Sequence, residues 1–104
     1  MKKYLIKIDV EALSDLREIT AWYELQKVDL GKRFQNAVIE QINHLAENPQ
    51  IFVIRYQKIR CMPVKKFPYM IHFYINTQDS SVEVLAVIST DRNPKIWKEK
   101  TGRI

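Results

Sequence analysis

Residues 65–75 read KKFPYMIHFYI, in which two lysines run directly into an apolar, aromatic segment. Aromatic and β-branched residues favour strands, and Pro68 marks the start of this one because proline cannot donate a hydrogen bond to a central ladder. Residues 69–76 are therefore predicted to form a strand. Lys65 and Lys66 come just before this strand, so two positive charges lie at the start of a strand that is otherwise apolar.

Further strands are predicted on both sides of this segment. Residues 56–64 show no helical period, and residues 82–89 (VEVLAVIS) follow a polar turn at residues 78–81. Consecutive strands joined by short turns form an antiparallel meander. Near the start of the chain, residues 3–9 alternate between two faces, which predicts a half-buried strand.

Two amphipathic helices are predicted between these strands. The first spans residues 11–26, and the second runs from Asp29 to just before Asn48. Asp9 and Asp29 are placed to cap them. The two apolar stripes consist of Ala12, Leu16, Ile19 and Tyr23, and of Phe34, Val38, Ile42 and Leu45. A short break between two such helices predicts an antiparallel helical hairpin.

The predicted order is β-α-α-β-β-β, an α+β fold in one domain over residues 1–104. The helical hairpin has to bury both stripes against one face of a small, mainly antiparallel sheet. The other face is then left for strand side chains and basic residues. After Asn93-Pro94 a short helix is predicted around residues 96–100.

The positive charge is local. Residues 55–66 carry +5 and residues 92–104 carry +4, so the rest of a chain whose net charge is +5 carries −4. Local basicity suits a polyanion or an acidic protein partner. The basic residues of the two windows are Arg55, Lys58, Arg60, Lys65 and Lys66, and Arg92, Lys95, Lys98, Lys100 and Arg103.

Several classes of chemistry find no support in the sequence. Cys61 is the only cysteine, so neither an internal disulfide nor a zinc spacing is available. The chain has two glycines and no phosphate-binding loop. Asp15 and Glu18 lie one turn apart, but both are predicted on the outer face of the first helix without further acids nearby. We expect neither a metal nor a cofactor.

No membrane segment is predicted. Lys2 and Lys3 precede only a short apolar stretch that Lys7 and Asp9 interrupt, which does not resemble a signal peptide. No apolar run approaches the ~18 residues of a membrane span. A cytoplasmic protein without membrane contact is expected.

The order of elements and several residue strings resemble the RelE/ParE superfamily of bacterial type II toxins, over about residues 4–97. These strings are DLREITAWY, LGKRF, the NP that closes the second helix, KKFPYMIHFYI and VEVLAVISTDRNPKIW. The resemblance implies a small basic toxin that a cognate antitoxin holds inactive. RelE-like members cut messenger RNA in the ribosome, whereas ParE-like members poison DNA gyrase.

The nuclease branch implies basic catalytic residues that this chain only partly supplies. Met70 stands where an arginine is common, and relatives often have a histidine near Ser89, where this chain has none. The candidates that remain for acid–base and phosphate-stabilising roles are Arg60, Arg92, Lys58 and His72. This thin set favours the ParE-like reading, in which the protein would be no enzyme. A ribosome-dependent endoribonuclease, or a member that has lost toxicity but binds its antitoxin, stays open.

A target-binding surface is predicted at the rim of the sheet and on the basic tail. Its candidates are Arg60, Lys65, Lys66, Arg92, Lys95, Trp97 and Lys98. The target would be DNA gyrase, or the ribosome with its mRNA. The antitoxin is expected to lay acidic or apolar side chains over the helices and this basic rim.

Overall fold

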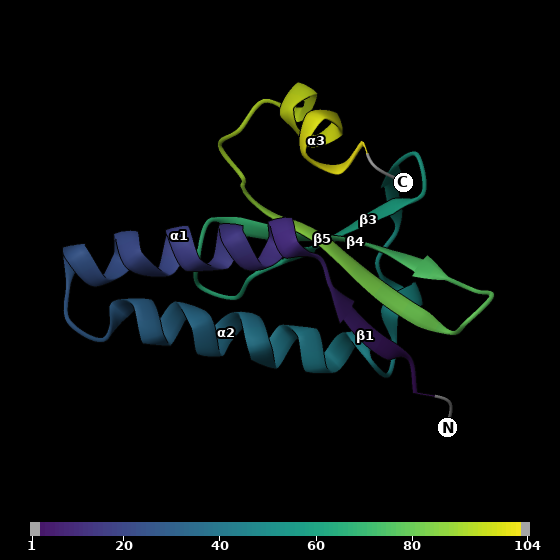
Figure 1. Cartoon of the computed structure of the whole chain (residues 1–104), viewed down its shortest axis with the longest axis horizontal. Coiled ribbons are helices and arrows are strands. Elements are labelled where there is room, and N and C mark those ends of the chain that lie inside the picture. Colours follow the sequence, from purple (N-terminus) through teal and green to yellow (C-terminus); the bar gives the residue numbers. More distant parts are fainter. Residues whose placement is uncertain (1–2, 103–104) are drawn as a thin grey trace.

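The computed structural model describes residues 3–102 (Figure 1). Its elements follow one another as β1 (Leu5–Ile8), α1 (Val10–Gln26), α2 (Leu30–Leu45), the 3-10 turn η1 (Pro49–Ile51), β2 (Ile54–Tyr56), β3 (Ile59–Pro63), β4 (Tyr69–Asn76), β5 (Ser81–Ser89) and α3 (Pro94–Thr101). The predicted α+β class and the helical hairpin are confirmed.

The strands form a five-stranded sheet in the order β1-β5-β4-β3-β2. β1 runs parallel to β5, and every other neighbouring pair is antiparallel. The prediction of one strand over residues 56–64 is wrong. Gln57 adopts a left-handed conformation with φ 49°, and with Lys58 it forms a turn that divides this segment into the hairpin β2–β3.

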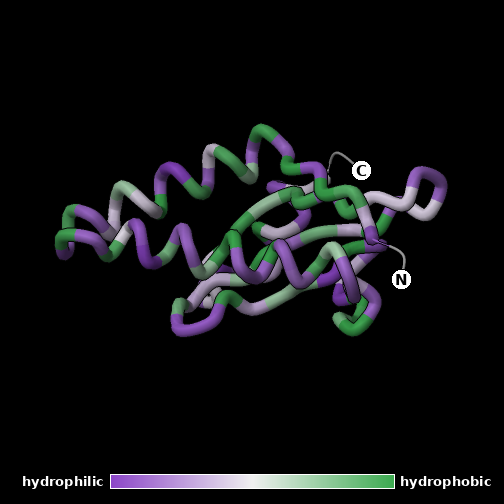
Figure 2. Tube along the Cα trace, turned by 90° about the horizontal axis from the view of Figure 1, so that it is seen from below, coloured by the Kyte–Doolittle hydropathy of each residue, from purple (hydrophilic) through white to green (hydrophobic). Residues whose placement is uncertain are grey.

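The main core lies between the helical hairpin and one face of the sheet. All four residues of the predicted α2 stripe are buried, whereas of the four residues of the predicted α1 stripe only Ala12 and Tyr23 are buried. Phe34 is completely buried and contacts the rings of Tyr23, Phe67 and Tyr69. Hydropathy alternates along both helices, as expected when one side of each faces the core (Figure 2).

The junction of α1 and α2 differs from the prediction. Asp29 sits before α2 with φ 70° and makes no side-chain cap, and Asp9 makes none for α1. Instead the Glu24 carboxylate accepts hydrogen bonds from the backbone N–H groups of Gly31 at 2.9 Å and of Lys32 at 3.3 Å. A Cβ at Gly31 would lie 2.4 Å from the Thr20 carbonyl oxygen, so glycine allows the two helices to approach here.

An irregularity in β5 changes which of its side chains lie on each face of the sheet. His72 pairs with Ala86 and Phe73 with Val84, so Leu85 is an extra residue. Such a bulge breaks the simple alternation of a strand. As a result Val84 and Val87 both belong to the main core, whereas Ala86 and Ile88 join a second cluster with Trp97.

This second cluster corrects the prediction of an open second face. α3 packs on β5 on the side away from the hairpin (Figure 1), and Trp97 covers Met70, Ala86 and Ile88. The tail is therefore a helix of residues 94–101 that closes half of the face.

Candidate functional site

Local sequence explains why α3 forms and how it is oriented. The Asn93 side chain accepts a hydrogen bond from the Lys95 N–H at 2.9 Å, and Pro94 occupies the first turn. Trp97 is 9% exposed, and its ring lies 5.4 Å from that of Tyr56 and 5.0 Å from that of His72. Lys95 and Lys98 are exposed on the same helix. The helix thus presents two lysines and hides the tryptophan.

Beneath Trp97 a chain of hydrogen bonds holds α3 to the sheet. The Thr101 hydroxyl donates to the Trp97 carbonyl at 2.7 Å. Tyr56 Oη lies 3.0 Å from Thr101 Oγ1 and 2.9 Å from His72 Nδ1, so this hydroxyl connects α3 to β4. Because Thr101 uses its proton on the Trp97 carbonyl, both contacts are satisfied when Tyr56 donates to Thr101 and accepts from His72 Nδ1–H.

His72 and Cys61 also lie together, with Sγ 3.5 Å from Nδ1. Burial, with the nearby charge of Arg55 in a lesser role, lowers the pKa of His72 to about 4. Burial raises the pKa of Cys61 to about 11, although Arg55 opposes the shift. Both groups are neutral at pH 7, so this pair provides neither a thiolate nucleophile nor an imidazolium acid.

Asp15 makes a second connection between α3 and the rest of the fold. The prediction that it lies on the outer face of the first helix is wrong. Its side chain is buried and accepts a hydrogen bond from the Val87 N–H at 3.0 Å and an ion pair from Lys100 Nζ at 2.7 Å. This charged residue can lie beside the buried stripe of α1 because its carboxylate accepts the hydrogen bond of a backbone N–H group close to the β5 bulge. The helical spacing of the apolar residues alone does not predict that Asp15 is buried.

Arg92 is exposed after β5 and faces a hollow of about 370 Å³ between α1, β5 and α3. Glu18, Tyr69, Ser89 and Lys100 also line this hollow. Burial raises the pKa of Tyr69, and the Arg92 charge opposes that shift. The hollow thus brings Arg92 near a phenol, but it contains acids as well as bases.

The other three nuclease candidates lie elsewhere. Arg60 of β3 lies opposite Phe73 of β4, on the face of the sheet that α1 and α2 cover. Its guanidinium donates hydrogen bonds to the carbonyls of Phe52 at 2.7 Å and Gln50 at 3.3 Å. Lys58 is in the exposed β2–β3 turn, and His72 is fully buried under α3. Within residues 3–102, no hydrogen bond or ion pair joins any two of the four candidates.

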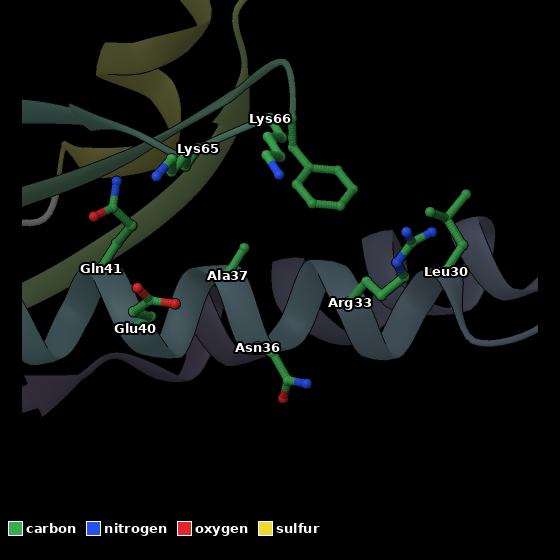
Figure 3. A pocket seen from close by; sticks show the side chains of 9 residues that line it. Leu30, Arg33, Asn36, Ala37, Glu40, Gln41, Lys65 and Lys66 are labelled. Atoms are coloured by element: carbon green, nitrogen blue, oxygen red, sulfur yellow. The ribbon is translucent and has the colours of Figure 1, made fainter.

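Lys65 and Lys66 are exposed in the loop between β3 and β4. Together with Arg33 of α2 they line a groove of about 530 Å³ (Figure 3). Sequence reasoning missed Arg33. A signal existed, because Leu30, Arg33 and Ala37 recur at helical spacing on one side of α2. Arg103 of the basic tail lies outside the described residues.

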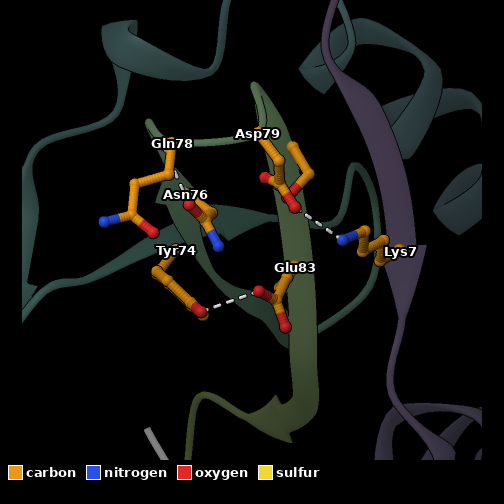
Figure 4. A network of polar contacts seen from close by, with 7 residues as sticks. Lys7, Tyr74, Asn76, Gln78, Asp79 and Glu83 are labelled. Carbon is orange, nitrogen blue, oxygen red and sulfur yellow. Dashed lines mark hydrogen bonds and ion pairs between the residues drawn. The ribbon is translucent and has the colours of Figure 1, made fainter.

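The uncovered half of the second face is acidic, which corrects the expectation of basic residues there. Tyr74 donates to Glu83 at 2.7 Å, and Lys7 pairs with Asp79 at 2.7 Å (Figure 4). The hydrogen bond to Glu83 raises the pKa of Tyr74 to about 12, assisted by burial and by the charges of Glu83, Asp79 and Asp9. The exposed positive charge that could contact a partner therefore lies at the rim of the sheet and not on this face.

Two further features bear on the class of protein. Within the described residues, no three histidine, cysteine or acidic side chains gather as metal ligands would. None of the helices there has the length and apolarity needed to cross a bilayer.

The sequence matches the family described as the ParE toxin of the type II toxin–antitoxin system parDE, over residues 6–94. This match covers most of the chain, and the chain therefore belongs to that family, whose members are the toxin components of type II systems. A search of curated proteins found no match.

Solved structures of the wider RelE/ParE superfamily share the fold. The chromosomal ParDE system of P. aeruginosa aligns with a TM-score of 0.74 at 14% identity, over 84% of this chain and 96% of that one. A mutant of the E. coli toxin RelE in the free state aligns with a TM-score of 0.73 at 16% identity, over 98% of each chain. The toxin–antitoxin complex RelBE2 of Mycobacterium tuberculosis gives 0.61 at 18% identity, over 84% and 98%.

Proposed function

We propose that this toxin acts by binding, that its target is DNA gyrase, and that a cognate antitoxin neutralises it. The antitoxin is supported by the solved relatives, several of which are toxin–antitoxin complexes. The gyrase target is supported by the match to the ParE family.

One observation carries the choice of binding over cleavage. Cutting RNA through the 2′-hydroxyl requires a base, an acid and phosphate-stabilising cations around one scissile bond. The four candidates for these roles are dispersed: Arg60 is tied to loop carbonyls, Lys58 lies in a turn, His72 is buried and neutral, and Arg92 stands at the end of β5. This dispersal favours an inhibitor that needs only a surface.

The basic rim provides such a surface. Arg92, Lys95 and Lys98 follow one another along the segment that leads into and through α3, and all three are exposed. Because Trp97 anchors this helix from below, the two lysines of α3 are held on an ordered element. Ordered charges bind a partner at a smaller entropic cost than charges on a frayed tail.

The test is ATP-dependent supercoiling of relaxed plasmid by purified gyrase with increasing toxin. We expect inhibition by the wild-type chain and a graded loss, about tenfold in inhibitory concentration, in the double variant Lys95→Ala/Lys98→Ala. Lys3→Ala/Lys27→Ala removes the same charge from exposed positions elsewhere and should inhibit as the wild type does.

A parallel measurement separates the alternatives. The toxin is induced alone in a bacterium, and new RNA 5′ ends are mapped within minutes. Cuts inside translated codons that disappear in Arg92→Ala would establish the endoribonuclease and refute the proposal. Intact messages with normal growth would indicate a member that has lost toxicity.

A further inference from the structure

One side of α1 is exposed to solvent and has apolar residues at both ends. Positions 10, 13, 17, 21 and 24 follow one another at intervals of three or four, so they lie along the same side of the helix. We call these exposed residues the outer stripe: Val10, Leu13, Arg17, Ala21 and Glu24. Val10 is 81% exposed, and Val28, just past the end of the helix, is 79% exposed. Apolar residues exposed along a continuous row indicate contact with another molecule.

The outer stripe points away from both cores. Asp15, which connects α1 to α3, is buried and stands two residues from Leu13 and two from Arg17, so it lies on the other side of the helix. The hairpin of α1 and α2 also extends past the end of the sheet (Figure 1, Figure 2). A second molecule can therefore lie along α1 without displacing any part of the fold.

The charges of the outer stripe cancel, although the whole chain carries +5. Arg17 makes no side-chain hydrogen bond or ion pair within residues 3–102. Glu24 is exposed, and its carboxylate is already held in place because it accepts the Gly31 N–H at 2.9 Å. Two copies of a basic chain repel each other least where the local charge is zero and each copy offers one cation and one anion.

The order of the residues along the stripe fits a two-fold axis. In an antiparallel pair of identical helices, each contact occurs twice, once on either side of the axis. Residues 17 and 24 have the same midpoint as residues 13 and 28, between positions 20 and 21. One arrangement therefore brings Arg17 to the partner's Glu24 and Leu13 to the partner's Val28. Ala21 lies next to the axis, where its small side chain lets two helices approach.

We propose that this toxin forms a symmetric dimer in which the outer stripes of two α1 helices pack antiparallel. A second copy is favoured over an unrelated protein because the stripe complements itself in both charge and apolar contact. The contact is small: α1 has 17 residues and is about 26 Å long, so it buries less than the ~800 Å² per partner of a standard interface. The dissociation constant is therefore expected in the micromolar range. The inference does not depend on the identity of the target.

The experiment is sedimentation equilibrium of the full chain, freed from antitoxin, from about 1 µM to about 200 µM at low salt. We expect monomer at the lower end and dimer at the upper end. Arg17→Glu places like charges opposite each other and should raise the dissociation constant at least about tenfold. Arg33→Glu, the matched control, makes the same change at an exposed position of α2 outside the stripe and should leave the constant within about twofold.

Glu24→Gln tests the other half of the ion pair. The amide oxygen can still accept the Gly31 N–H, so the junction of α1 and α2 is kept while the charge is removed. The dissociation constant should rise severalfold. Thermal melts of Arg17→Glu and Glu24→Gln check that each variant is folded.

A disulfide can trap the dimer independently of these variants. Ala21→Cys puts a thiol next to the proposed axis, so mild oxidation should yield a covalent dimer. The native Cys61 does not interfere, because it is buried and burial raises its pKa to about 11. Thr77→Cys, exposed in the β4–β5 turn, is the control and should stay monomeric under the same conditions.

Three results would overturn the inference. A wild-type chain that is monomeric at every concentration would exclude the dimer. A dimer that Arg17→Glu leaves intact and Ala21→Cys does not trap would show that another surface joins the copies. A monomeric wild type that loses affinity for its antitoxin in Arg17→Glu, but not in Arg33→Glu, would assign the outer stripe to the antitoxin. None of these measurements uses gyrase, so they stand whether or not the toxin inhibits it.

Discussion

The second face of the sheet, which points away from α1 and α2, has two halves that differ in what covers them. One half, around Met70, His72 and Ile88, is closed by α3 and forms a small aromatic core. The other half, around Tyr74 and Glu83, stays open and is occupied by a polar network (Figure 4). The same strands, β4 and β5, run through both halves, so the difference comes from the tail that folds back over only one of them.

This difference determines where exposed positive charge remains on the surface. In the covered half, burial keeps the potentially reactive groups neutral. In the open half, acids pair with a lysine and a phenol, which leaves little there for a negatively charged partner. Exposed positive charge is left at the periphery, on the β3–β4 loop, on α2 and on α3. This distribution of charge is what supports the proposal that the toxin binds its target through the basic rim.

The largest effect is expected from opening the covered half. Trp97→Ala removes the ring that packs on Tyr56 and His72 and also contacts the Arg55 guanidinium at 5.5 Å. The free energy of unfolding should fall by about 3 kcal/mol in urea titrations. Trp22→Ala, the matched control, removes a ring that is 54% exposed and should cost less than about 1 kcal/mol. Equal losses would show that α3 adds no stabilising core.

The covered half should also make stability depend on pH. The pKa of His72 is about 4 in the folded protein, below the ordinary value of 6.5, so between these values the unfolded chain binds the extra proton. Stability is full above pH 6.5 and decreases as pH falls to 4, by up to about 3 kcal/mol. Burial raises the pKa of Cys61, which contacts the imidazole, to about 11, so this thiol does not titrate in this window.

His72→Gln keeps a hydrogen-bonding side chain but cannot titrate, so urea titrations from pH 7 to pH 4 should show a smaller slope. His44→Gln changes an exposed histidine and should retain the wild-type slope. An unchanged slope in His72→Gln would mean that other groups cause the acid sensitivity.

A smaller effect is expected where α1, β5 and α3 meet. Asp15→Ala leaves the Val87 N–H without its acceptor and removes the ion pair with Lys100, which should cost about 1–3 kcal/mol of unfolding free energy. Glu18→Ala, one turn away and exposed, should be nearly neutral. Hydrogen exchange of the Val87 amide measures the effect at the site, and wild-type protection in Asp15→Ala would contradict the role given to this carboxylate.

The smallest effect is expected in the open half. Lys7→Ala removes an ion pair with Asp79 in which both side chains are nearly half exposed. Solvent and salt screen such a pair, so the unfolding midpoint in urea should stay within experimental error. A clear drop would mean that the polar network stabilises this half as the aromatic cluster stabilises the other.

Much of the fold could be predicted from local pattern. The strand at residues 69–76 has the predicted bounds, and the stripe Phe34, Val38, Ile42 and Leu45 is buried throughout. Some of the differences arise from contacts with residues far away in the chain. The sequence predicts Asp15 on the outer face of the first helix, yet its side chain is buried and accepts a hydrogen bond from the Val87 N–H of β5.

The candidate site could be predicted only in part. Lys65 and Lys66 were found because they are adjacent in sequence, but Arg33, which faces the same groove from α2, was not among the candidates. Trp97 was expected on a target-binding surface, and the structure places it beneath α3 with its ring covered. Whether the remaining exposed residues contact a target stays a prediction.

The sequence by itself determined the elements, their order, the two helical stripes and the family, because these depend on local period, on turn residues and on strings of neighbouring residues. Only the tertiary structure decided which half of the second face is covered, why His72 is neutral, and that three cations from α2 and a distant loop surround one groove. Period specifies which side of an element is apolar. It does not specify which element will pack there, since that depends on strand register, the β5 bulge and contacts between residues far apart in the chain.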